Sequence, residues 1–264
     1  MQIFANTNKI KDSARELILE WQSRGYCSIQ PSIDDHIWVN KIGQVCLFDL
    51  TIFRNMNERA RNAELVILGN KDVGDVMSEN MTHGFFWARH PKMLEESIAN
   101  SLIDWDTRKF HSTGIFQVEN AIQAQRRMIS WGDVMDNYQC KLKPANLKSY
   151  VTDHNSYISQ LLDSKYGLDQ LGFGARCNRL VEICAVGAIP VIPDDYYKDM
   201  FNSFLENTHF LIANDPEEFK TKTQLTKDEG TFISQKANEF YWENFSIEGS
   251  FMLLSRILEE KGII

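Results

Sequence analysis

The 264-residue sequence has few cysteines, and their spacing fits neither a disulfide framework nor a zinc cluster. The five cysteines are an odd number and include no Cys-x-x-Cys pair, which indicates a reducing compartment. No run of apolar residues approaches the roughly 20 that a membrane span needs. The first residues also lack the basic region and long apolar run of a signal peptide. We therefore expect a cytoplasmic protein without a membrane span, located in the host cytoplasm if its source is viral.

An excess of basic charge is also missing. The chain carries 28 Lys and Arg against 36 Asp and Glu, a net charge of −8, so no global attraction draws it to nucleic acid or anionic membrane. The sequence contains no Walker loop, no Gly-x-Gly-x-x-Gly after a strand and no Gly-x-Ser-x-Gly elbow. Hydrolase and nucleotidase functions therefore lack support.

Strand-like and helix-like segments alternate along the chain, which predicts an α/β protein. Apolar residues recur at helical spacing over 11–24, and Gly25 follows as a stop. A short strand over 112–117 is followed by a predicted helix over 118–138. The polar and basic segment 139–150 has little apolar periodicity, so it is the best candidate linker. We therefore expect two α/β domains, one over 1–139 and the other over 140–264.

The segment "CNRLVEICAVGAIPVIPDD" (177–195) combines charged residues with a buried-looking strand. On a helix at about 100° per residue, one face is apolar: Leu180, Ile183, Cys184 and Gly187. The opposite face is polar: Asn178, Arg179 and Glu182. The apolar face is expected to pack on a sheet while the polar face meets a ligand. The same arginine and glutamate can equally form an exposed ion pair worth a few tenths of a kcal/mol.

The residues around this helix suit a nucleoside diphosphate. Glycines in "LGFGARCNR", among them Gly174, let backbone amides approach an anion at the positive helix end. Arg176 and Arg179 suit diphosphate oxygens, and Glu182 can accept hydrogen bonds from ribose hydroxyls. Asp195 follows the apolar strand "AIPVI", where ligands of open α/β sheets collect.

The run "GFGARCNRLVEICAVGAIPVIPDDYYKDMF" (172–201) resembles the donor-binding half of GT-B glycosyltransferases with the exostosin-like pattern. That pattern has a glycine-containing lead, Arg-Leu-x-Glu, then Gly-(Cys/Ala)-Ile-Pro-Val-Ile and an acidic residue. Asn178 stands where the family often has serine, and Ala188 where it often has cysteine. The resemblance implies transfer of a sugar from a nucleotide-sugar donor, a UDP- or GDP-sugar, to a hydroxyl acceptor, with no further cofactor. The implied donor contacts in this run are Gly174, Arg176, Asn178, Arg179, Glu182 and Asp195.

The GT-B resemblance also implies two Rossmann-like domains facing a cleft, an acceptor-side domain over 1–139 and a nucleotide-sugar-binding domain over 140–264. It further implies a C-terminal helix that packs back across both of them. The apolar stripe Phe251, Leu254, Ile257 and Leu258, with Gly262 as stop, is consistent with such a helix, although ordinary helix packing explains it equally well. A second segment, "STGIFQVENAIQAQRR" (112–127), resembles the Gly-x-x-Glu-Asn-x-x-Gln-x-x-Arg pattern of small viral and bacterial relatives. It adds Glu119, Asn120 and Gln123 to the donor side, although Asn120 can equally be a helix cap.

The reaction expected from these residues is inverting and independent of metal. Asp104 and Asp106 have the Asp-x-Asp form of metal-dependent GT-A enzymes, but they follow a helix-like segment and are expected in a solvated turn. Retaining GT-B enzymes often carry Glu-x7-Glu ending where Glu182 stands, and the first of these positions is Gly174 here. Inversion needs one general base. The candidates lie in the loop "SIDDHIW", namely Asp34, Asp35 and His36.

The acceptor stays open between two classes. One is a glycan on a protein or an envelope polymer, which the acidic net charge favours. The other is hydroxymethylated cytosine in phage DNA, because phage DNA glycosyltransferases also use GT-B folds. Binding to DNA would draw on a basic stripe: Arg126, Arg127, Lys141, Lys143 and Lys148. A module that binds nucleotide sugars without catalysis is the third possibility.

Overall fold

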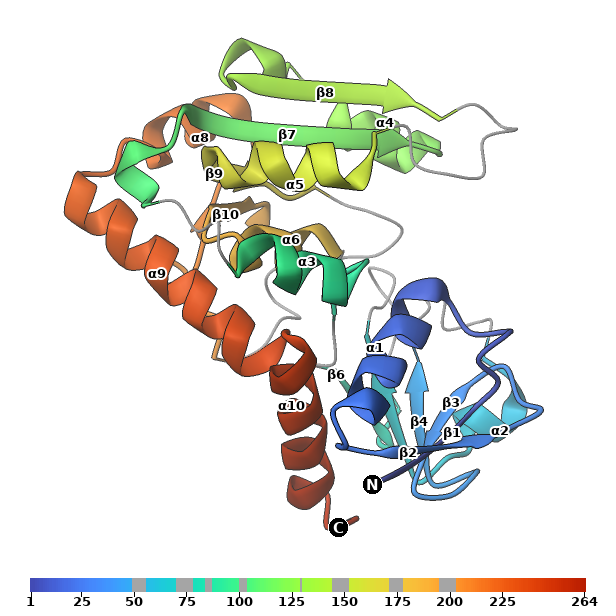
Figure 1. Cartoon of the computed structure of the whole chain (residues 1–264). Helices are drawn as coiled ribbons and strands as arrows, with labels where there is room; N and C mark the ends of the chain where they lie inside the picture. The colour runs from blue at the N-terminus through green and yellow to red at the C-terminus, as the bar shows by residue number, and fades with distance from the viewer. Residues whose placement is uncertain are drawn as a thin grey trace. The chain divides into compact units, whose positions relative to one another are not determined.

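The computed structural model describes residues 1–48, 56–69, 78–83, 87–99, 104–128, 130–143, 152–170, 178–194 and 203–264 (Figure 1). The chain forms two compact units that are discontinuous in sequence. The first unit comprises Met1–Glu95, Gly174–Val181 and Trp242–Ile264. The second unit comprises Glu96–Phe173 and Glu182–Tyr241. Each unit is built around its own β-sheet, so the α/β class expected from the sequence is confirmed.

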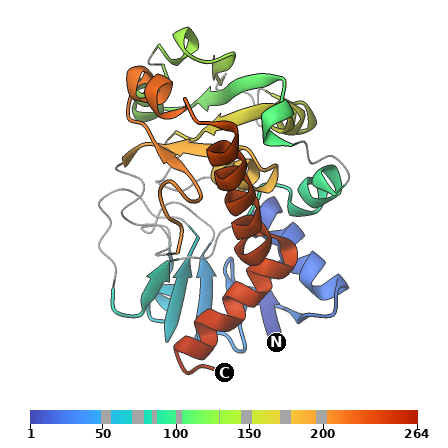
Figure 2. The ribbon, with the colours of Figure 1, turned by 90° about the vertical axis from the view of Figure 1, so that its left-hand side faces the viewer.

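The first unit contains a six-stranded sheet in the order β2-β1-β3-β4-β5-β6. Its strands are β1 (Gln2–Ala5), β2 (Ser28–Pro31), β3 (Ile37–Val39), β4 (Val45–Phe48), β5 (Leu65–Leu68) and β6 (Met81–His83). Strand β3 runs antiparallel to β1 and β4, and the other recorded strand pairs are parallel. The strands of this sheet, blue to teal, lie side by side in Figure 2. The short helix α2 (Glu58–Arg61) and the first part of α3 (Pro91–Ile98) belong to the same unit.

Helix α1 (Asp12–Ser23) covers this sheet with the face that its sequence periodicity predicts. The residues it buries are Ala14, Leu17, Ile18 and Trp21. The helix ends at Gly25, whose φ of 79° a residue with a side chain rarely adopts. The amide of Tyr26 then donates to the carbonyl of Trp21 at 2.9 Å, which satisfies a carbonyl of the last turn.

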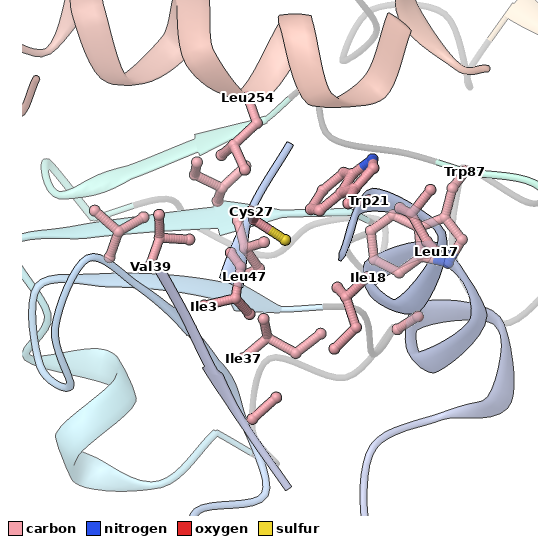
Figure 3. Packing of buried hydrophobic residues seen from close by; sticks show 14 of the residues in the cluster. Ile3, Leu17, Ile18, Trp21, Cys27, Ile37, Val39, Leu47, Trp87 and Leu254 are labelled. Atoms are coloured by element: carbon pink, nitrogen blue, oxygen red, sulfur yellow. The ribbon is translucent and has the colours of Figure 1, made fainter. Parts of the chain in front are cut away.

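The C-terminal helix α10 (Ile247–Glu260) packs into the core of the first unit. Leu254, Ile257 and Leu258 are buried in the same hydrophobic cluster as α1 and the sheet (Figure 3). The indole of Trp21 donates to the carbonyl of Ile247 at 2.8 Å, which ties the start of α10 to α1. The ring of Phe251 lies edge-on to Trp21 at a centroid distance of 5.5 Å. The apolar stripe predicted for the C-terminal helix is therefore confirmed, and it faces the N-terminal sheet.

The second unit contains a five-stranded sheet in the order β11-β10-β9-β7-β8, and all its recorded pairs are parallel. Its strands are β7 (Phe110–Val118), β8 (Asn137–Leu142), β9 (Ser164–Leu168), β10 (Ile189–Ile192) and β11 (Leu211–Ile212). Its helical segments are η2 (Trp105–Thr107), α4 (Ala121–Arg127), η3 (Trp131–Asp133), α5 (His154–Leu162), α6 (Asn178–Ala185), α8 (Pro216–Lys222) and α9 (Lys227–Asn244). Helices α6 and α9 extend beyond this unit at one end. Strand order and direction match the flavodoxin-like arrangement of doubly wound sheets.

The structure corrects two expectations about the middle of the chain. The predicted domain boundary between residues 139 and 140 falls inside β8, which pairs with β7 from Thr113↔Asn137 to Val118↔Leu142. The helix predicted over 118–138 ends at Arg127. Strand β8 lies at the edge of the sheet, and its side chains are half-buried or exposed. An edge strand of this kind needs no apolar run, so its sequence reads as a linker.

Truncating the buried face of α10 should destabilise the first unit. Leu254 is 0% exposed, so Leu254→Ala should lower the free energy of unfolding by about 2–5 kcal/mol through lost burial and a residual cavity. Met252 on the same helix is 51% exposed, and Met252→Ala should change the free energy of unfolding by less than about 0.5 kcal/mol. Denaturation of both variants with guanidinium measures these free energies. Equal effects of the two substitutions would contradict the packing of α10 on the first sheet.

Candidate functional site

The strand order of the second sheet defines where a ligand is expected to bind. In open α/β sheets, ligands bind beyond the carboxyl ends of the strands at the point where the strand order reverses. Strands β8 and β9 lie on opposite sides of β7, so the order reverses between β7 and β9. The chain leaves β7 through Glu119 and Asn120, and it leaves β9 through Asp169 and Gln170. Helix α4 begins at this edge, and so does α6, which joins β9 to β10.

The polar residues after β7 shape the start of α4. The side-chain oxygen of Asn120 accepts a hydrogen bond from the amide of Gln123 at 2.9 Å. The side-chain oxygen of Gln123 accepts one in return from the amide of Glu119 at 2.8 Å. Asn120 is therefore the cap of α4, and the buried Gln123 holds the preceding turn. Glu119 accepts from Lys143 Nζ at 3.3 Å, and it stays at the surface of this edge.

Helix α6 carries the segment that the sequence analysis singled out. Arg179 is 9% exposed and Glu182 is 0% exposed, and the apolar residues of the helix are buried as well. The exposed ion pair considered as an alternative for Arg179 and Glu182 does not fit this burial, because the described helix is enclosed by protein except at Asn178. Gly174, Arg176 and Asp195, the remaining residues predicted to contact a donor, lie outside the described residues.

A glycine ends α6 and returns the chain to the sheet. Gly187 has a φ of 67°, and its amide donates to the carbonyl of Cys184 at 3.0 Å. The amide of Ala188 donates to the carbonyl of Ile183 at 3.1 Å. This pair of bonds is a Schellman motif, which a left-handed glycine stabilises. The apolar strand β10 follows directly and is buried throughout, as the sequence predicts.

Side chains from other elements cap the carbonyl end of α6. Three side chains donate to main-chain carbonyls, each at 2.6 Å. Arg108 Nη2 donates to Val186, Ser234 Oγ to Gly187 and Asn238 Nδ2 to Ala185. Arg108 Nη1 also donates to the carbonyl of Ser164, the first residue of β9, at 2.9 Å. Burial lowers the pKa of Arg108 to about 10, which leaves it charged at neutral pH. A cation at the carboxyl end of a helix is favoured by the helix dipole.

Asp169 and Gln170 lie at the carboxyl edge of the second sheet, and neither is among the residues predicted from the sequence. They are 4% and 3% exposed and follow β9 directly. The amide of Asp169 donates to the carbonyl of Val191 in β10 at 2.8 Å, which fixes this turn to the sheet. Burial and, to a smaller extent, the Asp169 carboxylate raise the pKa of the Cys184 thiol on α6. The polar pair that follows the apolar end of "SKYGLDQ" is the signal that could have identified them.

The first sheet differs from the second because β3, the strand beside β1, is antiparallel to it, so the loop from β2 to β3 crosses the carboxyl end of β1. Strands β2 and β3 lie on opposite sides of β1, and the loop between them contains Asp34, Asp35 and His36. Asp34 Oδ1 accepts from the amide of His36 at 3.2 Å and from Asn57 Nδ2 at 3.3 Å. His36 is buried, and its Nε2 accepts from the amide of Asn57 at 3.4 Å. Asp34 and His36 therefore hold the loop against the start of α2.

Asp35 differs from its neighbours because its side chain points to the surface. The Asp35 side chain is 67% exposed, and its Oδ1 lies 3.1 Å from Lys9 Nζ. An open depression of about 480 Å³ adjoins these residues. Its lining residues are Lys9, Ile33, Asp34, Asp35, Asn57, Glu58 and Arg59. The Asp35 carboxylate therefore lines the depression while it is paired with Lys9.

The Asp-x-Asp segment lies in a turn, as expected, and has a structural partner. Asp106 belongs to η2 and forms an ion pair with Lys227 Nζ at 2.8 Å. The hydrogen bond from Lys227 lowers the pKa of Asp106. The indole of Trp105 is buried and donates to the carbonyl of Lys165 at 3.1 Å. Within the described ranges, no group of three or more His, Cys, Asp or Glu side chains is arranged to hold a metal ion.

The basic stripe considered for DNA binding does not form a continuous cationic surface. Arg127 is 5% exposed, so it is buried within the second unit. Lys143 lies 3.3 Å from the Glu119 carboxylate, which offsets its charge. Lys148 lies outside the described residues. In the part of the chain that the structure describes, no helix is long and apolar enough to cross a membrane.

The chain has little similarity to known proteins. No family model matches the chain, and no curated protein sequence matches it. Among solved structures, the chain is similar to the N-terminal domain of trehalose-6-phosphate phosphatase from Candida albicans, with a TM-score of 0.47 and 8% identity. That similarity covers 92% of this chain and 67% of the other. A likeness at this level assigns neither a family nor an activity.

Removing the cation that caps α6 should destabilise the second unit. Arg108→Met leaves the carbonyls of Val186 and Ser164 without their charged donor, and we expect a loss of about 2–4 kcal/mol in the free energy of unfolding. Lys220→Met is the matched control because Lys220 is exposed on α8, and it should have little effect. Chemical denaturation of both variants measures the difference. A loss below about 0.5 kcal/mol for Arg108→Met would contradict the capping role.

Proposed function

We propose that this protein is a nucleotide-sugar-dependent glycosyltransferase of the GT-B type, inverting and independent of metal, that transfers a sugar to a hydroxyl of a glycan on a protein or envelope polymer. The observation that carries the proposal is the position of two residue groups selected from the sequence. The α6 and Glu119 group lies at the carboxyl edge of the second sheet, beside its reversal point. The Asp34–His36 group lies in the loop from β2 to β3, at the carboxyl end of β1 in the first sheet.

In this proposal the donor binds at the edge of the second sheet. Arg179, in the first turn of α6, balances the diphosphate charge together with the positive end of the helix. Glu182, one turn later, accepts hydrogen bonds from the ribose hydroxyls. Burial of both side chains supports these roles because charge interactions are stronger away from bulk water. Positive charge at this position would stabilise the departing nucleoside diphosphate.

The acceptor binds in the depression of the first unit, and Asp35 is the general base. A base must lie within hydrogen-bonding reach of the acceptor hydroxyl. Asp34 and His36 are engaged in holding their loop, whereas the Asp35 carboxylate is exposed beside the depression. Both carboxylates and cations line this depression, which suits sugar hydroxyls because each hydroxyl both donates and accepts.

Two other functions remain as alternatives to be separated by experiment. Transfer to hydroxymethylated cytosine in DNA is disfavoured because the buried Arg127 and the paired Lys143 interrupt the basic stripe. A module that binds nucleotide sugars without turnover is favoured by the local hydrogen bonds that already occupy Asp34 and His36. Such a module would bind the donor and leave every acceptor unmodified.

The donor assignment is tested with a panel of UDP- and GDP-sugars and with the Glu182→Gln variant. The wild type should release nucleoside diphosphate from one donor, with or without EDTA. Glu182→Gln preserves side-chain volume at this buried position, and it should weaken calorimetric binding of the product by about 1–3 kcal/mol. Binding without release in the wild type would favour the non-catalytic module. Activity lost in EDTA and restored by manganese would contradict the metal-independent mechanism.

The base assignment is tested by comparing Asp35→Asn with Asp34→Asn. Asp35→Asn should lower kcat by about 10²–10⁴ while donor affinity and the unfolding midpoint stay unchanged, because an amide cannot accept the proton. Asp34→Asn should instead lower the unfolding midpoint, since Asp34 holds its loop through Asn57. Steady-state kinetics and thermal melts distinguish the two. If Asp35→Asn keeps full turnover, the base is another residue.

A further inference from the structure

Arg127 occupies an unusual position at the reversal point of the second sheet. It is the last residue of α4, and its side chain runs back along the helix toward the carboxyl edge. The guanidinium Nη1 donates to the carbonyl of Gln117 in β7. Nη2 donates to the carbonyl of Gln170, just after β9, at 3.4 Å. One buried cation thus links the ends of the two strands between which the order reverses.

The link lies where strand pairing stops. The recorded pairing of β7 with β9 ends at Thr113↔Gly167, although β7 continues to Val118. Beyond Gly167, the carbonyls of Gln117 and Gln170 are joined through the Arg127 guanidinium. Strand β9 ends at Leu168, whereas β7 runs on to Val118, so the turn after β9 lies beside the end of β7. In doubly wound sheets the ligand crevice lies beyond the strand ends at this position. The guanidinium holds the turn after β9 to the end of β7 there.

Neighbouring contacts hold Arg127 in this position. The hydroxyl of Tyr138 in β8 donates to the main-chain carbonyl of Arg127. The guanidinium carbon lies 5.4 Å from the centroid of the Phe116 ring, a distance typical of a cation–π contact. The planar fork of arginine can address two carbonyls at once, whereas a lysine ammonium is a single point charge. This geometry requires arginine at position 127.

We propose that Arg127 is a positioning residue that sets the spacing of the β7 and β9 ends and so shapes the floor of the nucleoside diphosphate site. The proposal rests on the proposed function for its ligand, and on the hydrogen bonds alone for the link between strands. Both terminal nitrogens of the Arg127 guanidinium donate to main-chain carbonyls, so Arg127 is assigned no direct contact with substrate. Its effect on the ligand passes through Gln117, Gln170 and the turn residues beside them.

The test compares Arg127→Lys and Arg127→Gln with the same two substitutions at Arg126, its half-buried neighbour on α4. Amide hydrogen exchange is followed over 117–120 and 168–170, and binding of UDP and GDP is measured by calorimetry. Both Arg127 variants should exchange about tenfold faster in these segments and bind the nucleotide about tenfold more weakly. Arg127→Lys should be the milder change because it keeps the charge, and it covers the case in which Arg127→Gln does not fold. The Arg126 variants should resemble the wild type.

The outcomes separate this inference from the proposed function. Exchange equal to that of the wild type in both Arg127 variants would overturn the link between the strands. Faster exchange with unchanged nucleotide affinity would overturn the positioning role and leave a structural one. If the wild type binds neither UDP nor GDP while the Arg127 variants exchange faster, the proposed function and the ligand named here fail, and the link itself is established.

Discussion

The enclosed carbonyl end of α6 is the constraint on which the candidate donor site depends. The last carbonyls of a helix have no partner within the helix, and leaving them unsatisfied inside a protein is costly. Here Arg108, Ser234 and Asn238 supply the donors, and Arg108 also binds the first residue of β9. The far end of α6 is thereby fixed at the amino edge of the sheet. Its first turn must then lie at the carboxyl edge, where the strand order reverses.

Charged groups are buried at that edge. Arg127, Asp169 and Glu182 are each at least nine-tenths buried. Burying ionised groups costs free energy that ion pairs and hydrogen bonds have to offset. Ionisable groups buried near the carboxyl ends of parallel strands occur both in structural networks and at ligand sites. Their burial is compatible with the proposed donor site.

The sequence predicted those features that depend on local periodicity. The apolar faces of α1 and α10 and the buried strand β10 follow from their spacing, and Gly25 and Gly262 end their helices as expected. Periodicity cannot tell whether the polar face of a helix meets water or protein, which is why an exposed ion pair stayed open for Arg179 and Glu182 of α6. The first crossing between units lies at Glu95 and Glu96, within the continuous helix α3, so no linker composition marks it. The predicted linker instead begins within the polar edge strand β8.

The carboxyl ends of β1 and β7, the first strand of each sheet, carry residues of opposite exposure. Beyond β1 lies an exposed carboxylate, Asp35, beside an open depression. Near the reversal point of the second sheet, Glu182 and Arg127 are buried. A proton acceptor must be reachable by an incoming hydroxyl, whereas a group that discriminates a bound nucleotide gains strength from exclusion of water. The difference in burial therefore corresponds to the division of roles between acceptor and donor that the proposed transfer requires.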